Sequence, residues 1–307
     1  MARKAHVSVA TVSRALSSPD LVRPDTRSRV LTAATELGYH PNRAARGLIT
    51  GKTGNLGIVV PDLDNPFFTG VLKAVQKRAA QSDYAVFVAN SDENPTAEAK
   101  LVQAMAKQVD GLVLCSPGLT DEQITATAGS TALVLLDHEL AGVPSTVMDR
   151  RGGTNQVFAH LAALGHRRVA VLNGTGPSVE PLDVVNLGPF APRYEGGLQA
   201  ADLALAADVT AIMAHNDVMA LGVLARLRDR GVSVPDDVSV TGFDNLTYAS
   251  LSTPALTTVR MPLSTAGRTA VAMLLERLDF PCGEVPHVVL PTQIIIRGTT
   301  APPPGKR

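Results

Sequence analysis

The sequence contains no Trp, only two cysteines (Cys115 and Cys282), and no apolar run near the roughly 20 residues of a membrane-spanning helix. Two cysteines exclude a scaffold held by several disulfides and a cysteine-based zinc site, and they fit a reducing compartment. The N-terminus also lacks the basic and then apolar segments of a secretory signal peptide. We therefore expect a cytoplasmic protein with no membrane partner.

The formal net charge is zero, because the sequence has 28 Lys and Arg and 28 Asp and Glu. The charges are nevertheless unevenly placed. Residues 1–53 hold nine Lys or Arg and three acids, a net charge of +6, and the rest of the chain carries −6. This split is typical of a small basic module joined to a larger body, and it favours contact with nucleic-acid phosphates. A merely solvated basic surface is the alternative interpretation.

Motifs of the common enzyme classes are missing as well. The sequence has no G-x-S-x-G, no H-E-x-x-H and no closely paired cysteines, and its seven histidines are scattered. Residues 51–53 (Gly-Lys-Thr) resemble the end of a phosphate-binding loop, but the first glycine of that pattern falls on Arg46. We predict no enzyme activity, no catalytic residue, no metal and no cofactor.

Residues 1–40 predict a head of short helices. Ser8 is suited to cap a helix over residues 9–16, and Pro24 and Gly38 are suited to begin and end another. Two short helices joined by a tight turn, with a third packed across them, form a helix-turn-helix. The predicted apolar side of the second of these helices carries Val30, Leu31, Ala34 and Leu37.

From residue 55 onward, short apolar runs alternate with helical stretches. This pattern indicates parallel sheets covered by helices, and about 230 residues are enough for two such lobes. The chain, at 307 residues and 45% hydrophobic, can bury these cores. Ligands of open α/β sheets bind beyond the carboxyl ends of strands, which brings together residues 62–68, 137–138, 216–217 and 244–245.

Several stretches resemble the lactose-repressor (LacI/GalR) family of bacterial transcription regulators, and the resemblance covers nearly the whole chain. In the head they are residues 7–16, 26–31 and 37–46. In the body they are residues 59–68, 109–112, 164–168, 215–222, 235–245 and 296–298. The resemblance implies an N-terminal all-α helix-turn-helix head plus an α/β two-lobed periplasmic-binding-protein-like effector domain.

The implied domains follow the chain in order. Residues 1–40 form the head, with a truncated first helix, and residues 41–53 form a hinge helix and linker. Residues 54–300 form the effector-binding and dimerisation domain, and residues 301–307 a disordered tail. Within the effector domain, the lobes comprise about 54–150 plus 261–290, and 151–260 plus 291–298.

The resemblance also implies that the helix over residues 9–16 lies in the major groove of double-stranded operator DNA. Arg14 can reach a guanine through two hydrogen bonds, and Val9 and Ala10 can contact a thymine methyl. A phosphate contact is the alternative for Arg14. The hydroxyl side chains suit phosphate contacts instead: Ser8, Thr11 and Ser13.

Residues 42–49 match the hinge helix of the family, which folds when two chains meet on operator DNA. Leu48 would then enter the minor groove as an apolar wedge, with Arg43 and Arg46 beside it. Asn42 completes the predicted DNA-binding set. Burial of Leu48 against the body is the alternative.

By family position, the effector contacts are Phe67, Phe68, Asn216, Asp217 and Asp244. Asp137 joins them through its place at a strand end. Carboxylates and amides suit the hydroxyls of a sugar, and an aromatic face suits its ring. Three alternatives stand beside these assignments. Asp217 could cap a helix, Asp137 could be ordinary loop, and the two phenylalanines could be partly core.

Three departures from the family pattern affect these expectations. His6 stands where the turn usually has glycine, although His tolerates a positive φ better than most residues. Residues 1–5 supply little more than one turn of the first helix, so we expect a form extended upstream to bind DNA more tightly. After residue 172 the family has a loop and a helix whose arginine grips the effector. This segment is missing after Ser178, and Arg193 does not match that arginine.

Loss of that helix predicts exposed apolar surface on the second lobe and weak or absent sugar binding. The predicted function is a homodimeric, sequence-specific transcription regulator of the repressor type. Its operator affinity is modulated by a small molecule, expected to be a sugar. A solute-binding protein of a transport system is the alternative, which the basic head opposes.

Overall fold

The computed structural model describes residues 1–17, 19–39, 51–174 and 182–305. The chain divides into two compact units, Met1–Gly54 and Asn55–Arg307, which we call the head and the body. Five residues named above lie outside the described residues: Asn42, Arg43, Arg46, Leu48 and Ser178. No helix in the described ranges is long and apolar enough to cross a membrane.

The head contains α1 (Val9–Ser17), the 3-10 turn η1 (Pro19–Leu21) and α2 (Pro24–Glu36). Its small core consists of Ala5, Val12, Ala15, Val30 and Ala33. The predicted turn chemistry is present, because the Ser8 hydroxyl accepts the N–H of Thr11 at 3.1 Å and His6 adopts a φ of +53°.

The prediction for the apolar side of α2 is wrong at two positions. Leu31 and Leu37 are 43% and 50% exposed, whereas Val30, Ala33 and Ala34 are buried. The buried residues follow the i, i+3, i+4 spacing of a single helix face, and Leu31 lies off that face. α2 ends at Glu36, one residue before Leu37, and Gly38 follows with a φ of +58°.

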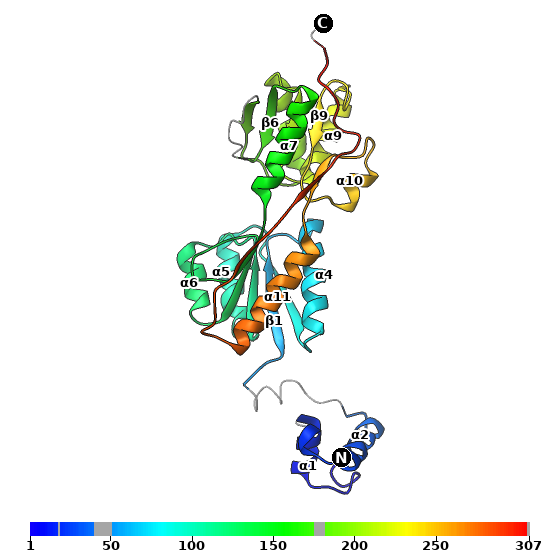
Figure 1. Ribbon diagram of the computed structural model, residues 1–307, viewed down its shortest axis with the longest axis vertical. Helices are drawn as coiled ribbons and strands as arrows, with labels where there is room; N and C mark the ends of the chain where they lie inside the picture. Colours follow the sequence, from blue (N-terminus) through cyan, green and yellow to red (C-terminus); the bar gives the residue numbers. More distant parts are fainter. Residues whose placement is uncertain (18, 40–50, 175–181, 306–307) are drawn as a thin grey trace. The chain divides into compact units, whose positions relative to one another are not determined.

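The first lobe of the body is built on a six-stranded parallel sheet in the order β11-β5-β4-β3-β1-β2. Its strands are β1 (Asn55–Val60), β2 (Ala85–Asn90), β3 (Gly111–Cys115), β4 (Ala132–Leu136), β5 (Ser145–Met148) and β11 (His287–Leu290). α4 (Pro66–Ala80) and α11 (Leu263–Asp279) cover one face (Figure 1). α5 (Pro95–Met105) and α6 (Asp121–Ala128) cover the other.

The second lobe is built on a four-stranded parallel sheet in the order β7-β6-β8-β9. Its strands are β6 (Arg168–Leu172), β7 (Asp183–Leu187), β8 (Ala211–Met213) and β9 (Ser239–Thr241). α7 (Arg150–Leu164) packs on one face. α8 (Tyr194–Ala206) and α9 (Asp217–Asp229) pack on the other, and the short α10 (Thr247–Leu251) contacts α9.

Three segments of the chain connect the lobes. The first runs from β5 into α7, the second from β10 (Thr258–Arg260) into α11, and the third from β11 into β12 (Gln293–Ile295). β10 and β12 pair antiparallel. The crossings therefore fall close to residues 150, 260 and 290, and one apolar cluster extends from the first sheet into the second.

The connection from β6 to β7 spans only residues 173–182, whereas parallel strands usually need a dozen or more connecting residues. The described residues of this lobe contain no helix between the two strands. On β6, Val169 and Val171 are buried, while Val184 and Val185 on β7 are only half-buried. Among the described residues of β6 and β7, the incompletely buried apolar side chains are those of the edge strand β7.

The tail was expected to be disordered from residue 301 onward, but Ala301 is hydrogen-bonded to the second lobe. Its N–H donates to the Ser239 hydroxyl at 3.1 Å, and its carbonyl lies 3.0 Å from Nε2 of His166. The expected start of the tail is therefore corrected, since the chain is anchored to β9 at Ala301.

Candidate DNA-binding head and effector cleft

The exposed face of α1 carries the residues predicted to read DNA. Val9 is 76% exposed, and Ala10, Ser13 and Arg14 are also exposed. The Val9 side chain is not part of the core of the head, so it is available for contact with a partner. Val12, in contrast, is buried in the core of the head.

Two predicted phosphate-binding hydroxyls lie together at the start of α1. The Ser8 and Thr11 side-chain oxygens are 2.8 Å apart and hydrogen-bonded. They sit where the free amides of the first helical turn and the helix dipole favour an anion. The geometry is compatible with a phosphate contact, which stays a prediction.

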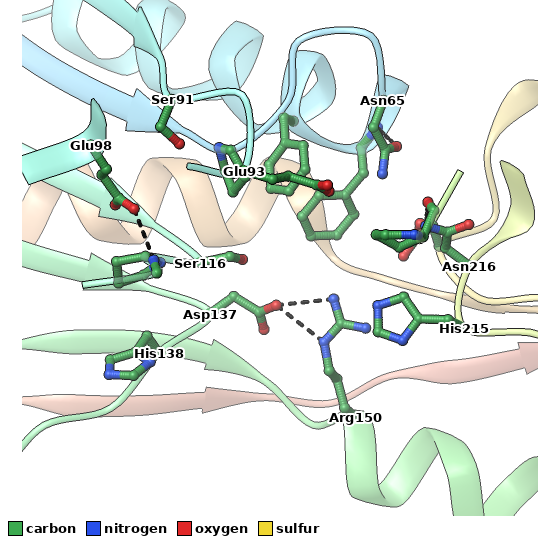
Figure 2. A pocket seen from close by; sticks show the side chains of 17 residues that line it. Asn65, Ser91, Glu93, Glu98, Ser116, Asp137, His138, Arg150, His215 and Asn216 are labelled. Atoms are coloured by element: carbon green, nitrogen blue, oxygen red, sulfur yellow. Dashed lines mark hydrogen bonds and ion pairs between the residues drawn. The ribbon is translucent and has the colours of Figure 1, made fainter. Parts of the chain in front are cut away.

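A cavity of about 420 Å³ opens between the two lobes of the body. We call it the cleft, and Figure 2 shows the side chains that line it. Five of the six residues predicted to contact an effector are among them: Phe67, Phe68, Asp137, Asn216 and Asp244. The structure thus brings together residues from four separate strand ends.

The two phenylalanines are positioned by the start of α4. Pro66 is the first residue of the helix, and the Asn65 side chain accepts the N–H of Phe67 at 3.0 Å. The two rings meet edge to face, with centroids 5.0 Å apart. Phe67 is only 2% exposed and Phe68 9%, so both belong to the core as well as to the cleft wall.

Asn216, and not Asp217, caps α9. The side-chain Oδ1 of Asn216 accepts the N–H of Met219 at 2.8 Å, while its side-chain Nδ2 donates to the Pro192 carbonyl at 2.8 Å. Asp217 is fully buried and does not line the cleft. Its carboxylate accepts the N–H of Leu246 at 2.7 Å and the hydroxyl of Thr258. The side chain of Asp217 therefore joins α9 to the segments around α10 and β10 and is not directed at a ligand.

Arg150 is one of several cleft residues that were not predicted from the sequence. Its Nε and Nη2 atoms donate to Oδ2 of Asp137 at 3.1 and 3.0 Å (Figure 2). The guanidinium also lies over the rings of Phe67 and Phe243, at 5.9 and 5.7 Å from their centroids. Arg150 lies two residues after the end of β5, so the strand-end rule would have found it if this short strand had been predicted.

Two buried polar atoms of the cleft have no hydrogen-bond partner within the described part of the chain: Oδ1 of Asp244 and Nε2 of His138. Burial raises the pKa of Asp244 well above its ordinary value, an effect that Arg150 opposes and that Asp217 and Asp137 reinforce. Asp244 also holds a φ of +107°, which is uncommon for a residue with a side chain. Such groups suit the hydroxyls of a polar ligand.

A second set of charges spans the lobes beside the cleft. Arg193, at the start of α8 in the second lobe, faces three acids of the first lobe. Its Nη2 lies 3.4 Å from Asp62, 3.5 Å from Asp92 and 3.7 Å from Glu93, taking the nearest carboxylate oxygens. These pairs connect the lobes without a covalent link, so they depend on how far the lobes are closed.

The head and the body together define the class of protein, a DNA-binding module joined to a two-lobed ligand-binding domain. Family models agree with this division. Residues 1–42 match "Bacterial regulatory proteins, lacI family", and residues 53–179 match "Periplasmic binding proteins and sugar binding domain of LacI family". Residues 158–300 match the "Periplasmic binding protein-like domain".

Whole-chain relatives make the assignment specific. The catabolite control protein A of Priestia megaterium is 32% identical over 327 residues, covering 98% of both chains. The transcriptional repressor CytR of Escherichia coli K12 is 30% identical, covering 98% of this chain and 95% of CytR. This chain belongs to the lacI family of bacterial regulatory proteins.

Solved structures agree over the same length. A lac repressor dimer bound to operator and the anti-inducer ONPF superposes with a TM-score of 0.85 at 27% identity, covering 98% of this chain and 97% of that one. A CelR–cellobiose complex superposes with a TM-score of 0.70 at 29% identity, covering 97% and 98%. The predicted fold class is confirmed, and these relatives are regulators rather than transport proteins or enzymes.

Proposed function

We propose that this protein is a homodimeric transcriptional repressor that reads operator DNA with α1 and responds to a sugar-containing effector bound in the cleft. The exposed face of α1 is the observation that carries the DNA-binding part. Arg14, a long basic side chain, and the apolar Val9 are both exposed on α1, and neither belongs to the core of the head. This combination suits bidentate contact to a guanine beside apolar contact to a thymine methyl.

The effector part is supported by the composition of the cleft. Its volume of about 420 Å³ falls within the range of small-molecule sites. Two aromatic rings, a side-chain amide that caps a helix, and buried carboxylates converge there. Two buried polar atoms of the cleft have no hydrogen-bond partner in the described part of the chain. These are the groups that hold a polyol: rings for its apolar face, and oxygen and nitrogen atoms for its hydroxyls.

Coupling between the two sites would act through the lobes. An effector that contacts both lobes binds their closed arrangement more tightly than their open one. It shifts the equilibrium toward the closed arrangement by that difference in binding free energy. The first lobe begins at Asn55, next to the segment that leads to the head. In a dimer, a change in lobe closure would alter the spacing of two heads, and thereby their fit to two half-sites.

Operator selection from random duplexes, followed by binding measurements on the selected site, tests the DNA-binding part. Arg14→Ala and Arg14→Lys form a matched pair, because the second keeps the charge but loses the two-pronged guanidinium. Loss of a bidentate base contact costs about 1–3 kcal/mol at one base pair. We expect both variants to lose preference at that base pair, with Lys retaining more of the affinity for random duplex. Equal losses on every sequence in Arg14→Ala would assign Arg14 to a phosphate instead.

A further inference from the structure

The side chains that line the cleft carry an excess of negative charge. In the described chain, four acids and one arginine line it: Glu93, Glu98, Asp137, Asp244 and Arg150. Histidine adds little positive charge, because burial lowers the pKa of His215 and favours its uncharged ring. A cavity lined mainly by one sign of charge concentrates that field. The cleft therefore disfavours anionic ligands such as sugar phosphates and favours cationic ones.

Two of the four carboxylates lie beside cations of the protein itself. Arg150 binds Asp137 at 3.0 Å, and Nη2 of Arg193 lies 3.7 Å from Oε2 of Glu93. The other two carboxylates form no ion pair with a described residue. The cleft thus holds acids that the described part of the protein does not pair with a cation.

Of these two acids, Asp244 suits a neutral partner. It is only 4% exposed, and its raised pKa favours the protonated, uncharged carboxyl group. Its Oδ1 atom has no hydrogen-bond partner in the described chain. Such a group can donate to, or accept from, a sugar hydroxyl.

Glu98 is the acid whose charge the fold does not require. It lies in the first turn of α5, is only 5% exposed, and its Oε2 atom accepts the N–H of Gly118 at 2.9 Å. The start of a helix favours an acid, but burial opposes its charge and raises the pKa of Glu98. A glutamine oxygen would accept the same hydrogen bond without the cost of burying a charge. A cation bound in the cleft would offset that cost.

Other oxygen atoms lie on the same first-lobe side of the cleft. Ser91 and Glu93 follow β2, and Ser116 follows β3. With Glu98 we call them the acidic wall. An ammonium group has three N–H donors and needs several such acceptors. Figure 2 shows Glu98 at the end of the cleft opposite Asn216, so the two ends can bind different parts of one ligand.

We infer that the effector is an amino sugar, whose protonated amine binds Glu98 at the acidic wall and whose hydroxyls bind Asn216 and Asp244 in the second lobe. This inference rests on the proposed function, because it specifies the ligand of the same site. Hydrogen bonds from an ammonium to a carboxylate are about twice as strong as those between neutral groups. A neutral sugar leaves Glu98 without a cation, which fits the expected weak binding of simple sugars.

Matched ligand series test the inference. Glucose, galactose and mannose would be compared by isothermal titration with the forms of each that carry an amine at the second or the sixth carbon. The full chain is used, in a buffer that keeps the amines protonated, and the N-acetyl derivatives are the uncharged controls. We expect one amine to bind at least about tenfold more tightly than its parent sugar and its N-acetyl derivative, a difference of about 1.4 kcal/mol.

Charge-removing variants locate the preference. Glu98→Gln keeps an oxygen that can accept the N–H of Gly118 but has no charge, so we expect it to bind the amine at least about tenfold more weakly. Glu122→Gln is the matched control, because Glu122 is an exposed acid in the first turn of α6 outside the cleft. It should bind the amine as the unaltered chain does. Glu93→Gln serves as a second variant if Glu98→Gln does not fold, and operator binding reports folding.

Three results would overturn the inference. The first is equal affinity for the amine, its parent sugar and its N-acetyl derivative, which would leave a sugar-responsive regulator in place. The second is an amine preference that persists in the folded variants of the acidic wall. The third is failure of every ligand to bind a protein that still binds operator. In that case the DNA-binding part of the proposed function would stand, because operator binding is measured independently of any effector.

Discussion

The two lobes of the body share one architecture but differ in how completely it is built. The first lobe has six parallel strands with two helices on each face. The second has four strands, with α7 on one face and a half-buried edge strand, β7. The complete lobe supplies the aromatic wall of the cleft. The reduced lobe supplies Asn216 and Asp244 to the same cleft.

The lobes also differ in how their helices pack. In the first lobe, a methyl group on Gly70 would meet the flexible end of the Leu263 side chain at 2.8 Å. In the second, a methyl group on Gly197 would meet the backbone oxygen of Met219 at 2.1 Å, because α8 and α9 cross at very close range. A side chain can rotate away, whereas a helix backbone cannot.

The largest expected effect therefore comes from Gly197→Ala. Forcing α8 and α9 apart should lower the free energy of unfolding by about 3 kcal/mol. Gly70→Ala should cost about 1 kcal/mol or less, since only a side chain must move. Urea denaturation of both variants measures the difference. Similar losses would contradict the claim that the second lobe is the more tightly constrained at its helix contact.

Arg150→Gln tests the contact between the lobes at the cleft. It leaves the Asp137 carboxylate, only 7% exposed, without its cationic partner. We expect a loss of about 1–3 kcal/mol in the free energy of unfolding. The double variant Arg150→Gln/Asp137→Asn should recover part of it, because the buried charge is then gone. Additive losses in the double variant would show that the two side chains are not coupled.

Arg193→Ala should change stability by at most about 1 kcal/mol, because the guanidinium is partly exposed and its pairs are screened by solvent. Its effect should instead appear in lobe closure, measured as a larger radius of gyration by small-angle X-ray scattering. Arg168→Ala is the matched control, because Arg168 pairs with Asp183 inside the second lobe. An unchanged radius in Arg193→Ala would mean that these pairs do not hold the lobes together.

The smallest expected effect is a pH dependence from His166 in the second lobe. Burial lowers the pKa of His166 below its ordinary value of about 6.5. Below that pH the unfolded chain takes up a proton that the folded ring resists, so acidification lowers the free energy of unfolding. Burial raises the pKa of Asp217 to about 7. Its protonation therefore raises the free energy of unfolding as the pH falls from about 7 to 4, which opposes the effect of His166.

Comparison with a variant separates these two contributions. In His166→Gln the stability lost between about pH 7.5 and 5.5 should be smaller than in the unaltered chain, because one titrating group is gone. Thermal unfolding in a pH series measures this. An identical pH profile for the two proteins would remove His166 from the explanation.

The central strands and most long helices could be predicted from sequence because their apolar runs and periodicity are strong. β5, β7, β10 and β12 are short, and β7 is half exposed, so they leave a weak signal. α8 carries Gly196 and Gly197, which disfavour a helix by propensity, but Gly197 permits the close contact of α8 with α9. The conformation of this segment is decided by its tertiary packing and could not be predicted from the local sequence.

The site was predictable in composition but not in detail. The strand-end rule gathered four segments, and the family resemblance selected most of the residues within them, five of which line the cleft. Asn216 and Asp217 are neighbours in the chain but have different roles. Asn216 lines the cleft and caps α9, whereas Asp217 is buried and hydrogen-bonded within the protein. Neighbouring polar residues at a helix start have the same sequence signal, so only the structure separates their roles. Arg150 was missed because the preceding strand was missed.

Fluorescence anisotropy on a selected operator tests the central claim most directly. The full chain would be titrated with that operator and with a scrambled duplex of equal length, at about 50 and 200 mM salt. If α1 reads DNA as proposed, the operator binds at least about a thousandfold more tightly than the scrambled duplex, and both affinities fall steeply with salt. Equal affinity for the two duplexes, or binding that ignores salt, would contradict the account.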